Sequence, residues 1–365
     1  LTPLAAALFH AIGRHPLAGL AAAFAGVSGG YSANLLIGSV DVLLAGLSEA
    51  AAHLINPKYT VAATANLYFM FVATFVVTAA GTWVTEKIVV PRLGEYRGSA
   101  PREELKPLSQ AERRGLWAAA ASVGLLTAVV LWGVLPADGF LRDPKNPAFE
   151  QSVFMRGLGT FIFLYGLLPG VAYGLAAGTL RNDHEIMAGM SATMKSMATF
   201  IVLAFFAAQF ISYFNWTNLG IILAVSGADF ISHLGLQKLP IVLMVALVLF
   251  AATVNLLISS ASAKWALLAP VFVPMFMLLG YSPELVQGAF RVGDSVTNII
   301  TPLMSYFPLI LTFAQKYEPK AGIGTMIATM LPYSIWFTIT WTALLIAWIA
   351  LGIPMGPGAP LFLAK

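Results

Sequence analysis

The chain has 365 residues, of which 59% are hydrophobic and 10% charged, and its mean hydropathy is +0.82. This composition lies outside the range of soluble globular domains. The sequence has no cysteine, which excludes disulfides, cysteine metal sites and thiolate catalysis, and its formal net charge of +4 requires no nucleic-acid partner.

Apolar runs recur along the chain, and several exceed the length of about 18 residues that indicates a membrane-spanning helix. Residues 1–90 contain a run, 17–47, that is interrupted by the sequence GVSGGYSAN, and a plain span at 67–90. We expect an all-α polytopic membrane protein, in which residues 1–90 form the end of a first structural repeat with a broken transmembrane helix.

Residues 91–115 form a basic loop with six Lys and Arg residues: Arg92, Arg97, Arg102, Lys106, Arg113 and Arg114. The excess of Lys and Arg in cytoplasmic loops places this loop on the inside. We expect residues 116–190 to form scaffold or dimerisation helices and residues 191–365 to form a second repeat. The spans expected between 116 and the C-terminus are 116–136, 153–180, 191–213, 219–237, 239–258, 285–314 and 323–353.

The stretch between two of these spans, 259–284, must leave and return on one side of the membrane. Lys238 marks the inside start of span 239–258, and the lysines after residue 314 mark the inside end of span 285–314. The intervening stretch is apolar but interrupted by prolines and a glycine. We therefore predict a re-entrant helical hairpin at 259–284 that opens to the outside.

The span after this hairpin carries three polar residues, Arg291, Asp294 and Asn298. Their i, i+3, i+7 spacing places them on one helical face, so Arg291 and Asp294 can form a structural ion pair or face a transport cavity. One charge at membrane depth costs roughly 2.5–3.5 kcal/mol on the insertion scale, which favours a functional role. Asn255 and the carboxylate suit a hard cation such as Na⁺, whereas an isolated carboxylate suits a proton relay.

The start of the hairpin adds Ser260, Ser262, Lys264 and Trp265. Lys264 either lies within the hairpin or extends to the membrane interface. Trp265 is either an interfacial anchor or an aromatic wall for a flat substrate.

A weaker echo of this pattern lies in the first half of the chain. Asn34 and Asp41 are spaced i, i+7 after the Gly/Ser-rich interruption, and GYSANLLIG loosely parallels GDSVTNIITP. Two repeats that each present a polar broken segment are typical of secondary transporters. Asp41 as a simple charge at a helix end is the alternative.

Enzyme signatures are poor. GVSGG at 26–30 matches the G-x-S-x-G pattern, but no strand precedes it and no triad partners are evident. There is no Walker A sequence for a self-contained ATP-driven pump. We predict a non-enzyme; a channel, or an intramembrane hydrolase with Ser28 or Ser259 as nucleophile, are the rival classes.

Four segments resemble the aminobenzoyl-glutamate transporter (AbgT) family: AGVSGGYSANLLIGSVD, TWVTEKIVVPRLGEYRG, SSASAKWALLAPVFVPM and GAFRVGDSVTNIITPLMSYFPLI. The resemblance covers essentially the whole chain, and this sequence is similar to the C-terminal two-thirds of longer members. The first helices and the first of two family hairpins are then expected to precede it. The resemblance implies a homodimer of inverted repeats with re-entrant hairpins and broken helices, in the inner membrane of a bacterium.

The resemblance also implies roles for individual residues. Asp41, Asn255 and Asp294 match positions tied to the coupling ion, as possible Na⁺ ligands, and with Asn34 and Asn298 they form the expected ion or proton site. The expected substrate residues are Ser260, Ser262, Lys264, Trp265, Pro283, Arg291 and Pro302.

The resemblance implies a secondary active transporter without a tightly bound cofactor, driven by Na⁺ or protons. The substrate class is p-aminobenzoyl-glutamate or related p-aminobenzoate compounds, and proton-driven efflux of sulfonamide antimetabolites is the alternative. Arg291 or Lys264 is expected to receive a substrate carboxylate, and a guanidinium can do so through two hydrogen bonds.

Overall fold

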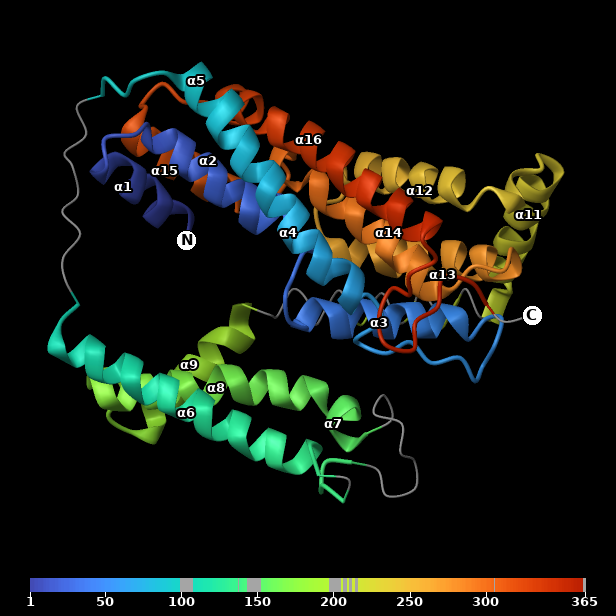
Figure 1. Cartoon of the computed structure of the whole chain (residues 1–365), viewed down its shortest axis with the longest axis horizontal. Helices are drawn as coiled ribbons and strands as arrows, with labels where there is room; N and C mark the ends of the chain where they lie inside the picture. The colour runs from blue at the N-terminus through green and yellow to red at the C-terminus, as the bar shows by residue number, and fades with distance from the viewer. Residues whose placement is uncertain are drawn as a thin grey trace. The chain divides into compact units, whose positions relative to one another are not determined.

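A computed structural model describes residues 1–98, 108–136, 138–142, 152–196, 205, 209, 212–213, 216–304 and 306–363. Throughout this part of the chain the regular structure is helical, apart from two isolated β-bridges, Tyr281–Phe362 and Gly356–Ala359 (Figure 1). The expected all-α class is therefore confirmed. Arg102, Lys106 and most of the expected span 191–213 lie outside the described residues.

The chain forms two compact units, Leu1–Leu105 with Gln209–Lys365, and Lys106–Ala208. The second unit contains α6 (Gln110–Val134), α7 (Val153–Arg156), α8 (Leu158–Ala177) and α9 (Asp183–Ser196). Helix α6 begins at a capping box, in which Ser109 and Glu112 each accept a hydrogen bond from the other's backbone N–H. Helices α6 and α8 pack against each other, and Thr127 bonds Tyr165 across the contact at 2.9 Å.

The first unit holds the remaining helices. They are α1 (Thr2–Ala11), α2 (Pro16–Phe24), α3 (Ser39–Ala52), α4 (Leu67–Val84), α5 (Val90–Leu93), α11 (Leu219–His233), α12 (Pro240–Asn255), α13 (Ala261–Leu278), α14 (Pro283–Val296), α15 (Phe307–Tyr317) and α16 (Ile323–Ala350). In Figure 1, α4 runs beside α16 and α12 runs along α14.

Five helical stretches among the described residues are long and apolar enough to cross a membrane: Leu67–Leu93, Gln110–Val134, Leu158–Ala177, Ala261–Leu278 and Ile323–Ala350. Four of them fall on spans that the apolar runs predict. The fifth, α13, falls on the stretch 259–284 that the charge pattern assigns to a hairpin.

This stretch differs from the expected pair of short helices. Helix α13 is continuous through Pro270 and Pro274, and the chain turns only at Gly280, where φ is +90°. Proline is tolerated inside membrane helices when neighbouring groups satisfy the freed backbone, so these prolines do not end the helix. The turn therefore joins α13 to α14, and 259–284 is not a self-contained hairpin.

The expected span 285–314 is also not one helix. Helix α14 ends at Val296, a short 3₁₀ turn covers Asn298–Ile300, and α15 begins only at Phe307. Arg291 and Asp294 are thus on a helix, but Asn298 lies beyond its end. The run 17–47 is interrupted as expected: α2 passes into a π-helical segment, Ala25–Gly29, and α3 starts at Ser39.

Close backbone approach fixes the position of α14 against α12. A Cβ at Gly293 would lie 2.3 Å from the carbonyl oxygen of Val248 and 2.8 Å from Cβ of Ala251. Only glycine allows this spacing, because any side chain would push the two helices apart. All fourteen residues of α14 are buried, so polar side chains on it must find partners within the protein.

Candidate functional site

Three interrupted helices meet at one place in the first unit. The interruptions follow α2, α12 and α14, and hydrogen bonds join them directly. Asn298 donates to the carbonyl of Ser28 at 3.1 Å, Ser28 is hydrogen-bonded to Tyr306, and Ser259 donates to the carbonyl of Leu303 at 3.1 Å. Non-helical backbone at membrane depth persists where it is buried in protein or lines a cavity, and here each break supplies partners for another.

The first charged pair joins α14 to the start of α3. The guanidinium of Arg291 donates to Asp41 Oδ1 at 2.6 Å and to the carbonyl of Ser32 at 3.1 Å. The other carboxylate oxygen of Asp41 accepts from Asn34 Nδ2 and from the backbone N–H of Gly38, both at 2.7 Å. Asp41 therefore lies in the first turn of α3, where the helix dipole favours a negative charge. It also pairs with Arg291, a cation from a part of the chain that is far away in sequence.

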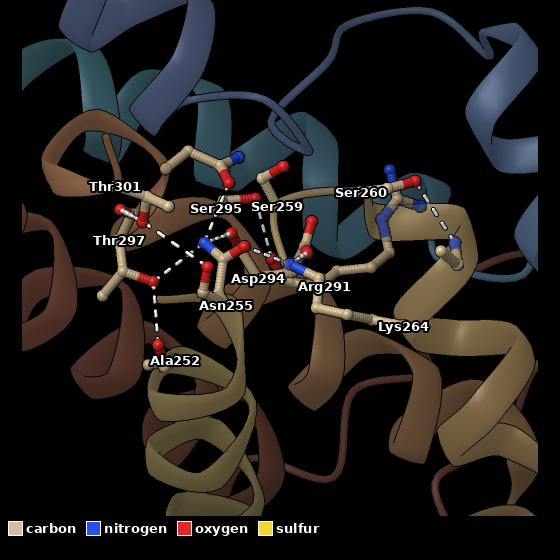
Figure 2. A network of polar contacts seen from close by, with 12 residues as sticks. Ala252, Asn255, Ser259, Ser260, Lys264, Arg291, Asp294, Ser295, Thr297 and Thr301 are labelled. Carbon is tan, nitrogen blue, oxygen red and sulfur yellow. Dashed lines mark hydrogen bonds and ion pairs between the residues drawn. The ribbon is translucent and has the colours of Figure 1, made fainter. Parts of the chain in front are cut away.

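The second charged pair joins α14 to α13. Lys264 forms an ion pair with Asp294, and its side chain is fully buried with 0% exposure. The same ammonium donates to Asn255 Oδ1 (Figure 2). A burial of this degree excludes the alternative in which Lys264 extends to the membrane interface.

These two pairs replace the direct Arg291–Asp294 ion pair that helical spacing allows. Arg291 pairs with Asp41 and Asp294 pairs with Lys264, so each residue of α14 takes its partner from another helix. The sequence spacing correctly places both groups on one helix, but it carries no information on which neighbouring helix supplies an opposite charge.

Asn255, the last residue of α12, connects the second pair to the break after α14. Its Nδ2 lies 2.7 Å from the backbone carbonyl of Asp294, 2.9 Å from Oγ1 of Thr297 and 2.8 Å from Oδ1 of Asn298. Its Oδ1 faces Lys264. The amide thus ties α12, α13 and α14 together at one point, as Figure 2 shows.

Trp265 is buried beside Lys264. Its ring stacks on Phe290 with centroids 4.4 Å apart, and its Nε1–H donates to Ser48 Oγ at 2.9 Å. Ser48 in turn donates to Gln287 at 2.6 Å. With 0% exposure, Trp265 is not an interfacial anchor in this structure.

Besides Trp265, four expected substrate residues lie outside these pairs: Ser260, Ser262, Pro283 and Pro302. Ser260 caps the N-terminus of α13 and is hydrogen-bonded to Ser262 at 3.3 Å. Pro283 occupies the first turn of α14, and Pro302 is exposed in the break that follows it. The backbone N–H of Lys264 donates to the carbonyl of Ser260 within the first turn of α13, but no described side-chain hydrogen bond joins the four residues to the charged pairs.

Several participating residues carry no distinctive sequence signal. Ser32, Ser295 and Thr297 lie inside the polar segments GYSAN and GDSVTN, and Gln287 lies in PELVQGAF, but no spacing rule singled them out. Ser32 N–H donates to Ser295 Oγ at 3.2 Å, which connects the first interruption to α14. The Gly/Ser-rich interruption indicated a polar broken segment, but not which of its hydroxyl or carbonyl groups contacts Arg291.

Two buried polar atoms next to the first charged pair have no hydrogen-bond partner within the described chain. They are Nε of Arg291 and Oγ of Ser32. A buried donor without a partner costs about 1–3 kcal/mol, so such atoms are good candidates for ligand contact. The candidate nucleophiles Ser28 and Ser259 instead bond a tyrosine hydroxyl and a backbone carbonyl, and neither partner is a histidine or a carboxylate.

Comparisons with known proteins agree over nearly the whole chain. Residues 1–363 match the model of the AbgT transporter family. The chain is 42% identical over 358 residues to the p-aminobenzoyl-glutamate transport protein of Escherichia coli (strain K12), an alignment that covers 98% of this chain and 70% of that protein.

Two solved structures have the same fold. The YdaH transporter of Alcanivorax borkumensis superposes with a TM-score of 0.91 at 47% identity, covering 98% of this chain and 74% of that one. MtrF of Neisseria gonorrhoeae, described as illuminating a class of antimetabolite efflux pumps, gives a TM-score of 0.89 at 49% identity, covering 99% and 72%.

Proposed function

The chain belongs to the AbgT transporter family, and from this premise we propose that it is a secondary active transporter of p-aminobenzoyl-glutamate or related p-aminobenzoate compounds. The observation that carries the proposal is the pair of buried ion pairs at the meeting point of three broken helices. Ionised groups at membrane depth mark transport pathways, and broken helices at mid-membrane form the sites of secondary transporters.

Arg291 is the proposed substrate anchor. Two of its nitrogens donate to Asp41 and to the carbonyl of Ser32, and Nε–H remains available to donate to a carboxylate oxygen of the glutamate moiety. Ser32 Oγ supplies a second open group beside it. Trp265, next to Lys264 on α13 and stacked on Phe290, is proposed to offer an aromatic face for the aminobenzoyl ring when α13 moves.

Movement is required because the site is closed. Lys264, Trp265, Arg291 and Asp294 are each at most 1% exposed. Helix α13 packs against α3 and α11, and substrate reaches these side chains only when α13 separates from α3. We propose that α13 and the break before it form the gate, and that the gradient of Na⁺ or protons drives its cycle.

The proposed setting is a homodimer in the inner membrane of a bacterium. A second candidate activity, proton-driven efflux of sulfonamide antimetabolites, is favoured by the similarity to MtrF. Both substrate classes contain a p-aminobenzene unit, so one pocket suits both, but only the glutamate conjugate carries carboxylates for Arg291.

The deciding experiment is flux in reconstituted vesicles. Labelled p-aminobenzoyl-glutamate and a labelled neutral sulfonamide are each followed under imposed Na⁺ and proton gradients. Accumulation against the substrate gradient supports secondary active transport, and flux that only follows the substrate gradient indicates a channel. Product release in detergent without vesicles would instead indicate a hydrolase.

The Arg291→Ala variant tests the anchor. It should weaken transport of the glutamate conjugate more than transport of the neutral sulfonamide, and equal losses would contradict the carboxylate contact. Asp294→Asn should abolish ion-driven flux, and unchanged flux would remove Asp294 from the coupling site.

A further inference from the structure

The ammonium of Lys264 lies where a free coupling cation would be expected. It is fully buried, pairs with Asp294 Oδ1 and donates to Asn255 Oδ1. A carboxylate and an amide oxygen are the donors that a hard monovalent or divalent cation takes in proteins. Both oxygens that the sequence assigns to Na⁺ at this point are therefore in contact with a protein cation.

The other expected ligand is occupied as well. Asp41 Oδ1 accepts from Arg291, and Oδ2 accepts from Asn34 and the N–H of Gly38. The donor set of Asp41, Asn255 and Asp294 does not fit Na⁺ in this structure.

Charge gives the same result. Asp41 and Asp294 carry two negative charges, and Arg291 and Lys264 carry two positive charges, so the buried cluster is neutral. Tyr31 and Tyr306, the other titratable side chains facing Asp294, are uncharged phenols at neutral pH. An added Na⁺ would place a second cation beside the Lys264 ammonium and compete with it for the same oxygens of Asp294 and Asn255.

The position of Lys264 near the start of α13 means that its positive charge depends on the Asp294 carboxylate for stabilisation. Lys264 is the fourth residue of α13, at the N-terminal end where the helix dipole disfavours a positive charge. Its backbone N–H bonds the carbonyl of Ser260, so the side chain leaves a well-formed first turn. The Asp294 carboxylate supplies the compensation that the helix itself does not.

We propose that Lys264 is a built-in cation that fills the ion position between Asp294 and Asn255, excludes Na⁺ from it and so determines the ion specificity of the transporter. The consequence for flux rests on the proposed transport function. Of the two coupling ions considered, Na⁺ and the proton, it leaves the proton. The statement about the ion position itself concerns binding and needs no substrate.

Thermal unfolding in detergent tests the binding statement. The purified protein is titrated with Na⁺ over about a hundredfold range at constant ionic strength, with K⁺ or choline as the replacement, because a ligand that binds the folded state raises Tm with its concentration. The wild type should show no Na⁺-specific rise in Tm. Lys264→Gln, which removes the ammonium and leaves Asp294 open, should start from a lower Tm and rise with Na⁺.

Two further variants complete the design. Lys264→Arg keeps a fixed cation and should stay insensitive to Na⁺, and it remains informative where Lys264→Gln does not fold. Lys58→Gln makes the same chemical change at an exposed loop lysine and should behave as the wild type. Na⁺-dependent stabilisation of the wild type, or a folded Lys264→Gln protein without a Na⁺ response, would overturn the proposal.

The transport assay separates this proposal from the proposed function. Flux of p-aminobenzoyl-glutamate should be independent of Na⁺ in the wild type and become Na⁺-dependent in Lys264→Gln. A protein that transports no aminobenzoyl compound but shows the expected Tm pattern contradicts only the proposed function. If the wild-type protein transports the compound and the flux depends on Na⁺, that result contradicts only the proposal that Lys264 is a built-in cation.

Discussion

Arg291 and Asp41 lie 250 positions apart in the chain, yet their side chains are joined at 2.6 Å in the protein interior. This ion pair ties the first broken segment to α14, and both partners also bond that segment: Arg291 donates to the carbonyl of Ser32, and Asp41 accepts from Asn34. The two polar interruptions recognised in the sequence are thus halves of one cluster.

Removal of one partner of this pair should be more harmful than removal of both. Arg291→Gln leaves the Asp41 carboxylate buried without its cation, which typically costs about 3–5 kcal/mol. In the Arg291→Gln/Asp41→Asn double variant, no unpaired charge remains, so the loss should be smaller than in the single variant. Thermal or denaturant unfolding of all variants in detergent measures the difference.

The chain offers an exposed pair as a control. Arg14 forms two hydrogen bonds of 2.7 Å to Glu86, and these side chains are 33% and 46% exposed. Exposed ion pairs contribute about 0–1 kcal/mol, so Arg14→Gln should change stability little. If Arg14→Gln and Arg291→Gln lower the unfolding free energy by the same amount, burial of the Asp41 carboxylate does not determine the effect of losing its cation.

A second prediction concerns the contact between α12 and α14. Gly293→Ala places a Cβ 2.3 Å from the carbonyl oxygen of Val248, so the helices must separate and move the adjacent Asp294. In Gly288→Ala on the same helix, the short contact is with the terminal methyl of Met355, which can turn aside, and the Asn66 side chain lies at 3.4 Å. Overpacking typically costs about 1–3 kcal/mol of unfolding free energy. We therefore expect a lower Tm and a lower flux for Gly293→Ala, but not for Gly288→Ala.

A comparable loss for both glycine variants would mean that α14 tolerates no added methyl group anywhere. That result would remove the specific role assigned to backbone contact at Gly293. The two variants have the same gain in helix propensity, so propensity does not separate them.

The sequence predicted the parts of the site that carry charge, because ionised groups within apolar runs are conspicuous. Asp41, Lys264, Arg291 and Asp294 are all selected by this criterion, and the structure places them in two ion pairs. The choice of partner was not predictable. Spacing along α14 describes one helix, whereas pairing depends on how α3 and α13 pack against it.

Helix boundaries in 259–314 were predicted less well, for a physical reason. Prolines and positive-inside counting indicated a break within 259–284, but Pro270 and Pro274 lie inside a continuous helix. The chain turns only near the end of that stretch, at Gly280, and a further interruption falls after Val296, where Thr297, Asn298 and Thr301 are hydrogen-bonded to Asn255. Hydroxyl and amide side chains near one another are therefore the better signal of a break here.

A third prediction addresses the hydrogen bonds that hold Trp265. Ser48→Ala leaves Trp265 Nε1–H and the amide oxygen of Gln287 without their shared partner, at a cost of about 1–3 kcal/mol. Trp265→Phe removes the donor but keeps an aromatic ring to stack on Phe290. In the double variant only one group loses its partner, so the two single losses in unfolding free energy should not add.

The same variants separate positioning from substrate contact. If Trp265 stacks on the aminobenzoyl ring, Trp265→Phe should retain binding of p-aminobenzoyl-glutamate, and Trp265→Leu should weaken it by more. Equal affinities for the Phe and Leu variants would show that the ring contributes packing alone.

The last prediction uses the pH dependence of stability at the junction of α1 and α2. Burial lowers the pKa of His15 below its ordinary value near 6.5, and Glu318, 3.9 Å away, partly offsets this effect. The unfolded chain therefore takes up a proton at His15 before the folded protein does. Stability from this group is fully present above about pH 6.5 and is lost as the pH falls toward the lower folded pKa.

His15→Asn removes this titration while keeping an acceptor at the N-cap of α2, where His15 Nδ1 accepts from the N–H of Leu17 at 3.3 Å. The Tm of the wild type should fall more between pH 8 and pH 5 than that of His15→Asn, because only the wild type carries the proton linkage at this site. His53→Asn, at an exposed loop histidine, is the matched control and should follow the wild-type curve. Parallel curves for wild type and His15→Asn would show that the His15 ring protonates equally in both states, contrary to its burial.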